Sequence, residues 1–278
     1  MKKFILMSFM LVLSCVFVLT GCMRNMTIQE FEKASSKALE NTYEILLTDK
    51  TNLSTHGDFT LVENITEKNY NQSNQTWETS NTITTIKRAG KGTNTIFEKT
   101  EYTKTDDGLG GIEEKTTKYI YTAISSGGNT TYYILKEFKA NNETEVKTIH
   151  KTFLSEALFI NEVYGLVANN LMEELYEKFY FGTGFLALAT GFQPEIKGNQ
   201  SNCQFKMTYS TSELNSSNLI ERATGTLKIE LKNSKFDTHV TSIEEFENGI
   251  KIAYSETTTK LSYSADISRI ENLDAYGK

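Results

Sequence analysis

The sequence KYIYTAISSGGNTTYYIL, residues 118–135, decides the fold class. It contains two runs rich in threonine, tyrosine and isoleucine, at 118–124 and 131–135, and the link SSGGN at 125–129 separates them. β-Branched and aromatic residues favour strands, and a short glycine-containing link between two such runs is typical of a β-hairpin. The segment therefore predicts two antiparallel strands joined by a tight turn.

The same pattern recurs along most of the chain. In residues 226–232, Leu227, Ile229 and Leu231 alternate with charged residues, which is typical of a half-buried antiparallel strand. We therefore expect long antiparallel strands connected as hairpins. Further strand-like runs lie at 58–62, 95–97, 203–209, 236–246 and 250–264, and the turn signals are RAGKG (88–92), DDGLGG (106–111), NN (141–142) and ENG (247–249).

Residues 69–87 differ from the other strand-like runs because they are polar on both alternating faces. A strand of this kind specifies its pairing register only weakly. We expect this segment to be a solvated edge strand or a partly mobile arm.

Two segments have the periodicity of helices. TIQE at 27–30 has the form of a capping box and predicts a helix that continues to about residue 47. Between 153 and 189, apolar residues such as Leu154, Leu158 and Val163 recur at helical steps and predict a helical insert at about 152–190.

Together these segments predict an α+β chain that is mainly antiparallel β. The order of these elements resembles that of a family of bacterial lipid carriers, and the resemblance implies a curved, open-barrel-like sheet with an N-terminal helix and a helical insert; the alternative is a β-sandwich with a helical insert. The chain has a single proline, and no Gly/Ser-rich linker divides it, so residues 27–278 are predicted to form one domain.

The N-terminus has the organisation of a secretory signal peptide at residues 1–21. Lys2 and Lys3 precede an apolar run of about fifteen residues, which is shorter than the roughly 20 residues of a membrane-spanning helix. Small residues then lead to Cys22 in the sequence LTGC, and a weaker match of the same kind ends at Cys15.

This N-terminus resembles the lipobox of bacterial lipoproteins. The resemblance implies cleavage before Cys22, attachment of a diacylglyceryl group to its thiol, and a cell-membrane location facing the extracytoplasmic side. Residues 22–26 would then be a short tether. The alternative is an ordinary signal peptide in which the cysteine occurs by chance.

Composition and motifs argue against several classes of function. The net charge of −6 disfavours a nucleic-acid partner. Cys203, His56, His150 and His239 lie far apart in the sequence and lack metal-ligand spacing, and no serine lies in a nucleophile elbow. We therefore expect no enzyme, with no catalytic residue, metal or cofactor, and Cys203 is predicted to be a buried, inert thiol.

The order of elements resembles that of the LolA/LppX-type lipoprotein and lipid carriers. In that family, a curved antiparallel sheet closed by helices holds acyl chains in an apolar cavity. The resemblance implies binding of a lipid or another apolar ligand between the sheet and the helices. The apolar, glycine-hinged end of the insert supplies candidate ligand-binding residues, which otherwise pack as ordinary core: Phe179, Phe181, Phe185, Leu186 and Leu188.

Two other functions remain open at this stage. The chain could be a structural or interaction lipoprotein whose polar strands, at residues 69–118, face a protein partner or the cell wall. It could also be an accessory protein or sensor of an envelope complex. The sequence identifies neither a ligand nor a protein partner.

Overall fold

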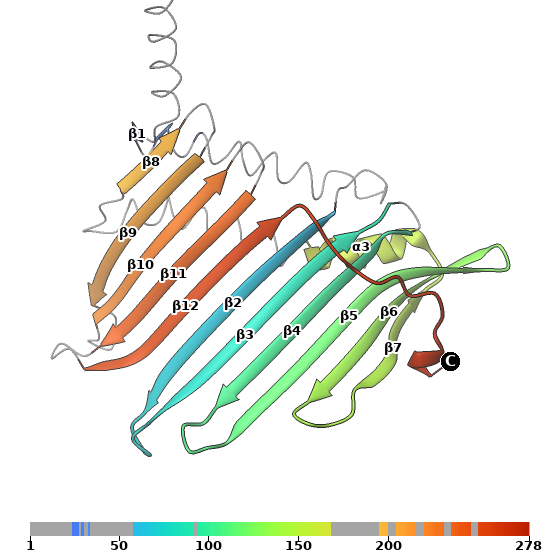
Figure 1. The fold of residues 1–278 in the computed structure, drawn as a ribbon, viewed down its shortest axis with the longest axis horizontal. Coiled ribbons are helices and arrows are strands. Elements are labelled where there is room, and N and C mark those ends of the chain that lie inside the picture. Colours follow the sequence, from blue (N-terminus) through green and yellow to red (C-terminus); the bar gives the residue numbers. More distant parts are fainter. Residues whose placement is uncertain are drawn as a thin grey trace, which may run out of the picture.

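A computed structural model describes residues 24–27, 29–30, 33, 58–91, 94–167, 195–199, 204–214, 220–230, 235–245 and 250–277. Within these ranges, twelve strands form one antiparallel sheet, which is long and strongly twisted (Figure 1). No helix in the described ranges is long and apolar enough to cross a membrane.

The sheet consists of two meanders that lie side by side. The first contains β2 (Phe59–Asn71), β3 (Thr76–Ala89), β4 (Ile96–Asp106), β5 (Ile112–Ser126), β6 (Asn129–Ala140) and β7 (Val146–Phe153). The second contains β8 (Glu195–Asn199), β9 (Gln204–Leu214), β10 (Ile220–Glu230), β11 (Lys235–Glu245) and β12 (Lys251–Ser262). β12 pairs with β2, and the short β1 (Arg24–Asn25) pairs with β8, so β1 and β7 are the two edges. The predicted mainly antiparallel, open sheet is confirmed, and the described strands form one sheet and not the two of a sandwich.

The hairpin that the sequence indicates most clearly is present as expected. β5 and β6 pair antiparallel up to Ser126 and Asn129. The two glycines between them, Gly127 and Gly128, have φ of +59° and +85°, a region that residues with a side chain rarely adopt. The turn chemistry therefore sets the register of this hairpin.

The expectation that residues 69–87 form an edge strand or a mobile arm is wrong. β3 pairs along most of its length with β2 on one side and with β4 on the other. Ladder hydrogen bonds join backbone groups and do not require apolar side chains. The polarity of this segment instead reflects its position. The end of β2 and the start of β3, which meet at their hairpin, extend beyond the buried core.

Helix α3 (Glu156–Val167) packs on one face of the sheet (Figure 1). The ring of Phe159 lies 5.0 Å from that of Tyr132 and 5.9 Å from that of Phe153. The helical start of the insert is confirmed, but its buried face matches the prediction only at Val163. Leu154 and Leu158 are 93% and 60% exposed, and the buried residues are Phe159, Ile160 and Val163.

The C-terminal segment, residues 264–277, lies against the opposite face of the sheet and ends in the short 3-10 helix η5 (Asp274–Tyr276) (Figure 1). Tyr276 is buried in a core cluster with residues of β4, β5 and β6, among them Ile120 and Leu135. The sequence patterns did not assign this segment to any element. The part of the sheet near β5 and β6 is therefore buried on both faces.

The capping box near the N-terminus is confirmed. The backbone N–H of Thr27 donates to Glu30 Oε2 at 3.0 Å, and the N–H of Glu30 donates to Thr27 Oγ1 at 3.2 Å. Arg24 and Asn25, which were expected to lie in the tether, form β1 and pair with β8. The remainder of the predicted N-terminal helix lies largely outside the described residues.

Candidate functional site

The face of the sheet that carries α3 has a continuous row of buried apolar side chains, which we call the apolar band. Directly opposite residues on neighbouring antiparallel strands point to the same face, as Leu61 of β2 and Ile86 of β3 do. The band crosses six adjacent strands, a width of roughly 24 Å at about 4.8 Å per strand. Its members, each at most 6% exposed, are Phe59, Leu61, Ile86, Phe97, Tyr121, Ile134 and Leu261.

Arg88 lies within the apolar band, between Phe59 and Phe97 in the pairing register. Its side chain is 1% exposed, and its guanidinium carbon lies 5.7 Å from the centre of the Phe97 ring. Burial lowers the pKa of Arg88 to about 10, although the charge of Asp58 opposes this shift. Arg88 therefore stays protonated at neutral pH and places a positive charge on this face, which also buries the polar side chains of Glu63 and Thr259 beside Leu61 and Leu261.

Sequence patterns assign Arg88 to a turn, because RAGKG contains two glycines. The structure extends β3 through Ala89, so the turn begins only after that residue. Arg88 follows Ile86 by two positions, and this spacing is the signal that places both side chains on the same face.

The ligand-binding residues predicted from the insert, Phe179, Phe181, Phe185, Leu186 and Leu188, lie outside the described residues. The same is true of Cys22, the predicted lipidation site, and of Cys203. These residues remain predictions.

A second feature is a charged groove of about 580 Å³ between the sheet and the C-terminal segment. Its centre is Glu137 on β6, whose side chain is only 5% exposed. Lys118 on β5 and Lys147 on β7 lie directly opposite Glu137 in the register, with Nζ–carboxylate distances of 2.5 Å and 2.8 Å. The hydroxyl of Tyr276 donates to Glu137 Oε1 at 2.6 Å.

These contacts determine the titration of the cluster. Burial raises the pKa of Glu137, but the hydrogen bonds from Lys118, Lys147 and Tyr276 outweigh it and lower the pKa to about 2. Burial, followed by the hydrogen bond to the Glu137 carboxylate, raises the pKa of Tyr276. A carboxylate with so low a pKa is a poor general base at neutral pH. The arrangement is suited to holding the C-terminal segment on the sheet and not to proton transfer.

Sequence reasoning did not identify the Glu137 cluster. Glu137 has the same alternation as Tyr133 and Leu135, which indicates an inward-facing carboxylate. An inward-facing carboxylate requires partners, and the hydroxyl partner, Tyr276, lies 139 positions away in the sequence.

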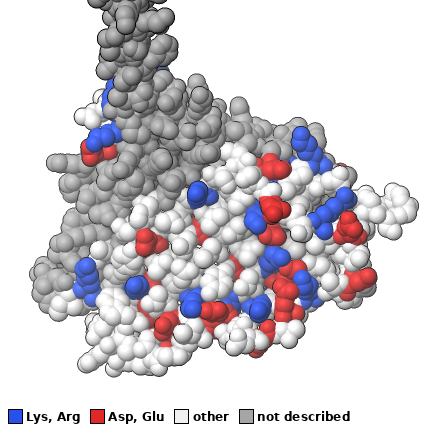
Figure 2. All heavy atoms as spheres, viewed as in Figure 1, with Lys and Arg blue, Asp and Glu red and all other residues white. Residues whose placement is uncertain are grey.

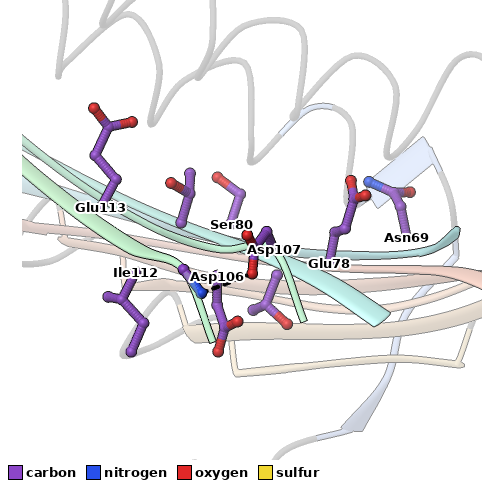
Figure 3. A pocket seen from close by; sticks show the side chains of 10 residues that line it. Asn69, Glu78, Ser80, Asp106, Asp107, Ile112 and Glu113 are labelled. Atoms are coloured by element: carbon purple, nitrogen blue, oxygen red, sulfur yellow. Dashed lines mark hydrogen bonds between the residues drawn. The ribbon is translucent and has the colours of Figure 1, made fainter. Parts of the chain in front are cut away.

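A third feature is a polar pocket of about 530 Å³ where the β2–β3 and β4–β5 hairpins end. Asn69, Glu78, Ser80 and Glu113 point to one side of the sheet, whereas Asp106 points to the other (Figure 3). The pocket is rich in carboxylates. However, none of the described residues forms a group of three or more side chains arranged to hold a metal ion.

The two aspartates of the β4–β5 turn have structural partners. Asp106 Oδ1 accepts the N–H of Gly108 at 2.8 Å, and Asp107 Oδ1 accepts those of Leu109 and Gly111 at 2.8 Å and 2.9 Å. These hydrogen bonds lower the pKa of Asp107. The interpretation of DDGLGG as a hairpin turn is confirmed.

The two histidines within the described residues, His150 and His239, also have partners. The His150 ring packs edge-on against Tyr119 at 5.4 Å, and His239 Nε2 lies 2.6 Å from Glu256 Oε1. Lys, Arg, Asp and Glu are interspersed over the face that carries the C-terminal segment (Figure 2). Among the residues that Figure 2 colours, no extended patch carries a single sign of charge.

No protein-family model, curated protein or solved structure shows a significant match to the chain. The geometry of the described residues is therefore the basis for a functional proposal.

Proposed function

We propose that the chain is a membrane-anchored bacterial surface lipoprotein that binds a lipid or another apolar ligand on the α3 side of its open sheet and catalyses no reaction. The observation that carries the proposal is the apolar band. It extends over β12, β2, β3 and β4, well beyond Tyr121, Tyr132 and Phe153, the aromatic residues that contact Phe159 of α3. Small-molecule sites are mostly apolar walls with a few placed polar groups, and this band includes the buried Arg88.

The covalent path of the chain also supports the proposal. α3 packs against β6 and β7 near one edge of the sheet, whereas β8 lies next to the opposite edge. Nine strand spacings separate β6 from β8 in the sheet order, a distance of roughly 43 Å at about 4.8 Å each. Residues 168–194, which include the predicted ligand-binding phenylalanines and leucines, connect α3 to β8.

The proposed anchor is close to the sheet. A single residue, Met23, separates Cys22 from β1, and β1 is paired with β8. Lipid attachment at Cys22 would therefore hold this edge of the sheet near the bilayer, and two or more acyl chains are needed for stable anchoring.

The ligand site is tested by photo-cross-linking. The full-length chain is incubated with a diazirine-bearing fatty acid, irradiated and digested, and the labelled peptides are identified by mass spectrometry. We expect labels on peptides that contain Phe59, Ile86 or Phe97. Labels confined to the groove under the C-terminal segment, or no saturable labelling, would reject the apolar band as the binding site.

The anchor has a separate test. The intact mass of the chain isolated from a bacterial membrane should lack residues 1–21 and carry a diacylglyceryl group, and Cys22→Ser should abolish both changes. A wild-type chain that retains residues 1–21, or that carries no lipid, would contradict the anchor.

A second candidate function rests on a different observation. The hairpin-end halves of β2 to β5 are half-buried or exposed and rich in threonine and asparagine, as expected of an interaction surface. In this case the apolar band would be ordinary core, and the cross-linking experiment would show no fatty-acid site.

A further inference from the structure

The tip of the β2–β3 hairpin carries an exposed aromatic pair. Trp77, the one tryptophan of the chain, is 40% exposed, and its ring centre lies 5.4 Å from that of the directly opposite Tyr70. Lys87 on the same strand donates to the backbone of Asp266 in the C-terminal segment, and Trp77 has the same alternation as Lys87. The aromatic pair therefore lies on the sheet face that carries the C-terminal segment.

The position of the pair is set by two hairpins together. A Cβ atom added at Gly108, in the β4–β5 turn, would lie 2.5 Å from the carbonyl oxygen of Trp77 and 2.9 Å from Cβ of Thr76. The turn therefore packs closely against the strand that carries Trp77. Gly108 also has φ of +71°, which favours glycine at this position.

Hydrogen-bonding side chains border the aromatic pair on the same face. Thr79 follows Trp77 by two positions and pairs with Lys68 on β2 and with Asp106 on β4. Lys68, Thr79 and Asp106 therefore form one cross-strand row on three adjacent strands, two positions from Tyr70 and Trp77. One oxygen of Asp106 accepts the N–H of Gly108, and its second oxygen is available to a ligand.

Opposite charges also pair farther along this face among the described residues. Lys104 pairs with Glu114 at 2.7 Å, and Lys118 and Lys147 both pair with Glu137. These ion pairs leave little net charge on this part of the face to attract a polyanion or a polycation. The net charge of −6 further disfavours a nucleic acid as the molecule stacked on Trp77.

We propose that Trp77 and Tyr70, together with Lys68, Thr79 and Asp106, form a binding site for a neutral saccharide. A sugar ring has an apolar C–H face that packs on an aromatic ring, and its hydroxyl groups both donate and accept hydrogen bonds. The aromatic pair with its bordering donor and acceptor groups matches both properties.

The place of the site in the sheet identifies the source of the saccharide. Asn25 of β1 lies in the same cross-strand row as Val62 of β2, through the pairings of β8 to β12. Tyr70 is eight positions farther along β2, or roughly 27 Å at 3.4 Å per residue. β1 and the hairpin tips lie at opposite ends of the sheet (Figure 1). Given the proposed anchor at Cys22, the site is far from the bilayer, and the partner is a chain of surface or wall polysaccharide and not a glycolipid head group.

Trp77 is itself the probe for the test. The full-length chain, in a detergent without a sugar head group, is titrated with chitohexaose, cellohexaose and maltohexaose while tryptophan emission is recorded. We expect a saturable change with at least one of them. Tyr70→Ala and Asp106→Asn should each raise the dissociation constant at least tenfold, whereas Leu109→Ala, an exposed position in the neighbouring turn, should leave it unchanged.

A second arm distinguishes the sources. The anchored chain is placed in phosphatidylglycerol vesicles with and without glucosyl-diacylglycerol, and we expect equal Trp77 emission in both. No saturable response to any of the three hexasaccharides, equal affinity in the variants, or a response only to the glycolipid would each overturn the proposal. The readout does not involve the apolar band, so it is independent of the outcome for the proposed lipid site.

Discussion

The Glu137 cluster allows a quantitative test of how the C-terminal segment is held on the sheet. Glu137→Gln keeps the shape of the side chain but removes the charge that Lys118, Lys147 and Tyr276 share. The two lysine side chains are 30% and 33% exposed, so both ammonium groups can turn toward water in the variant. The main loss is therefore the stabilisation of the carboxylate itself.

The shift in pKa sets the size of that loss. The folded protein lowers the pKa of Glu137 from 4.5 to about 2, and each pKa unit corresponds to about 1.4 kcal/mol. The loss at pH 7 is therefore about 3–4 kcal/mol, somewhat more than a typical hydrogen bond to a charged group contributes. Because the folded-state pKa is depressed, this stability is present above pH 4.5 and is lost as the pH falls toward 2.

Urea unfolding followed by circular dichroism measures this effect. With a slope of roughly 2–3 kcal/mol per molar urea, Glu137→Gln should lower the midpoint by about 1–2 M at pH 7. At pH 3 the difference in stability between wild type and variant should shrink by about 2 kcal/mol, because more than half of the stabilisation by the carboxylate is already lost at that pH. Glu114→Gln is the matched control: Glu114 also pairs with a lysine at 2.7 Å, but it is 43% exposed, so its midpoint should not move. An equal loss at pH 7 and pH 3 would refute the reasoning.

Three further predictions use the same unfolding assay. Gly108→Ala should destabilise the protein by about 1–3 kcal/mol and alter the emission of Trp77, because the added Cβ meets the Trp77 carbonyl at a positive φ; unchanged emission would contradict the packing of the two tips. Phe159→Ala should cost about 3–5 kcal/mol, whereas Leu158→Ala, at a 60% exposed position, should cost little; comparable losses would mean that α3 buries another face. Thr27→Ala should cost about 1 kcal/mol by removing the capping box, and no change would show that this helix start adds nothing to stability.

The hairpins were predictable because their signals are local. Gly127 and Gly128 supply positive φ between two β-rich runs, and the Asp107 carboxylate caps the backbone of its own turn. In each hairpin, the two strands and the turn that joins them lie within one short stretch of sequence. Such signals were enough to predict mainly antiparallel strands joined as hairpins, but they left an open sheet and a sandwich as alternatives.

The wrong predictions have a common physical cause, since they depend on neighbours that are distant in the sequence. Residues 69–87 lie inside the sheet because β2 and β4 supply backbone partners, which the side-chain pattern does not show. α3 buries Phe159 and not Leu158 because Tyr121 and Tyr132, on β5 and β6, lie beneath that side of the helix.

The candidate sites also combine local features, which the sequence predicts, with distant contacts, which it does not. Alternation within single strands predicts the faces of Ile86 and Leu61, but only the sheet order joins them into one band. Arg88 and Glu137 were missed because their environments are assembled from several strands and, for Glu137, from the C-terminal segment.

Native mass spectrometry of the full-length chain, purified from a bacterial membrane and measured before and after organic extraction, tests the central claim most directly. The account predicts a non-covalent apolar molecule bound at near one-to-one stoichiometry, which extraction removes and incubation with membrane lipid restores. A chain that purifies without such a molecule, and whose mass is unchanged by incubation with membrane lipid, would contradict the claim and leave the apolar band as ordinary core.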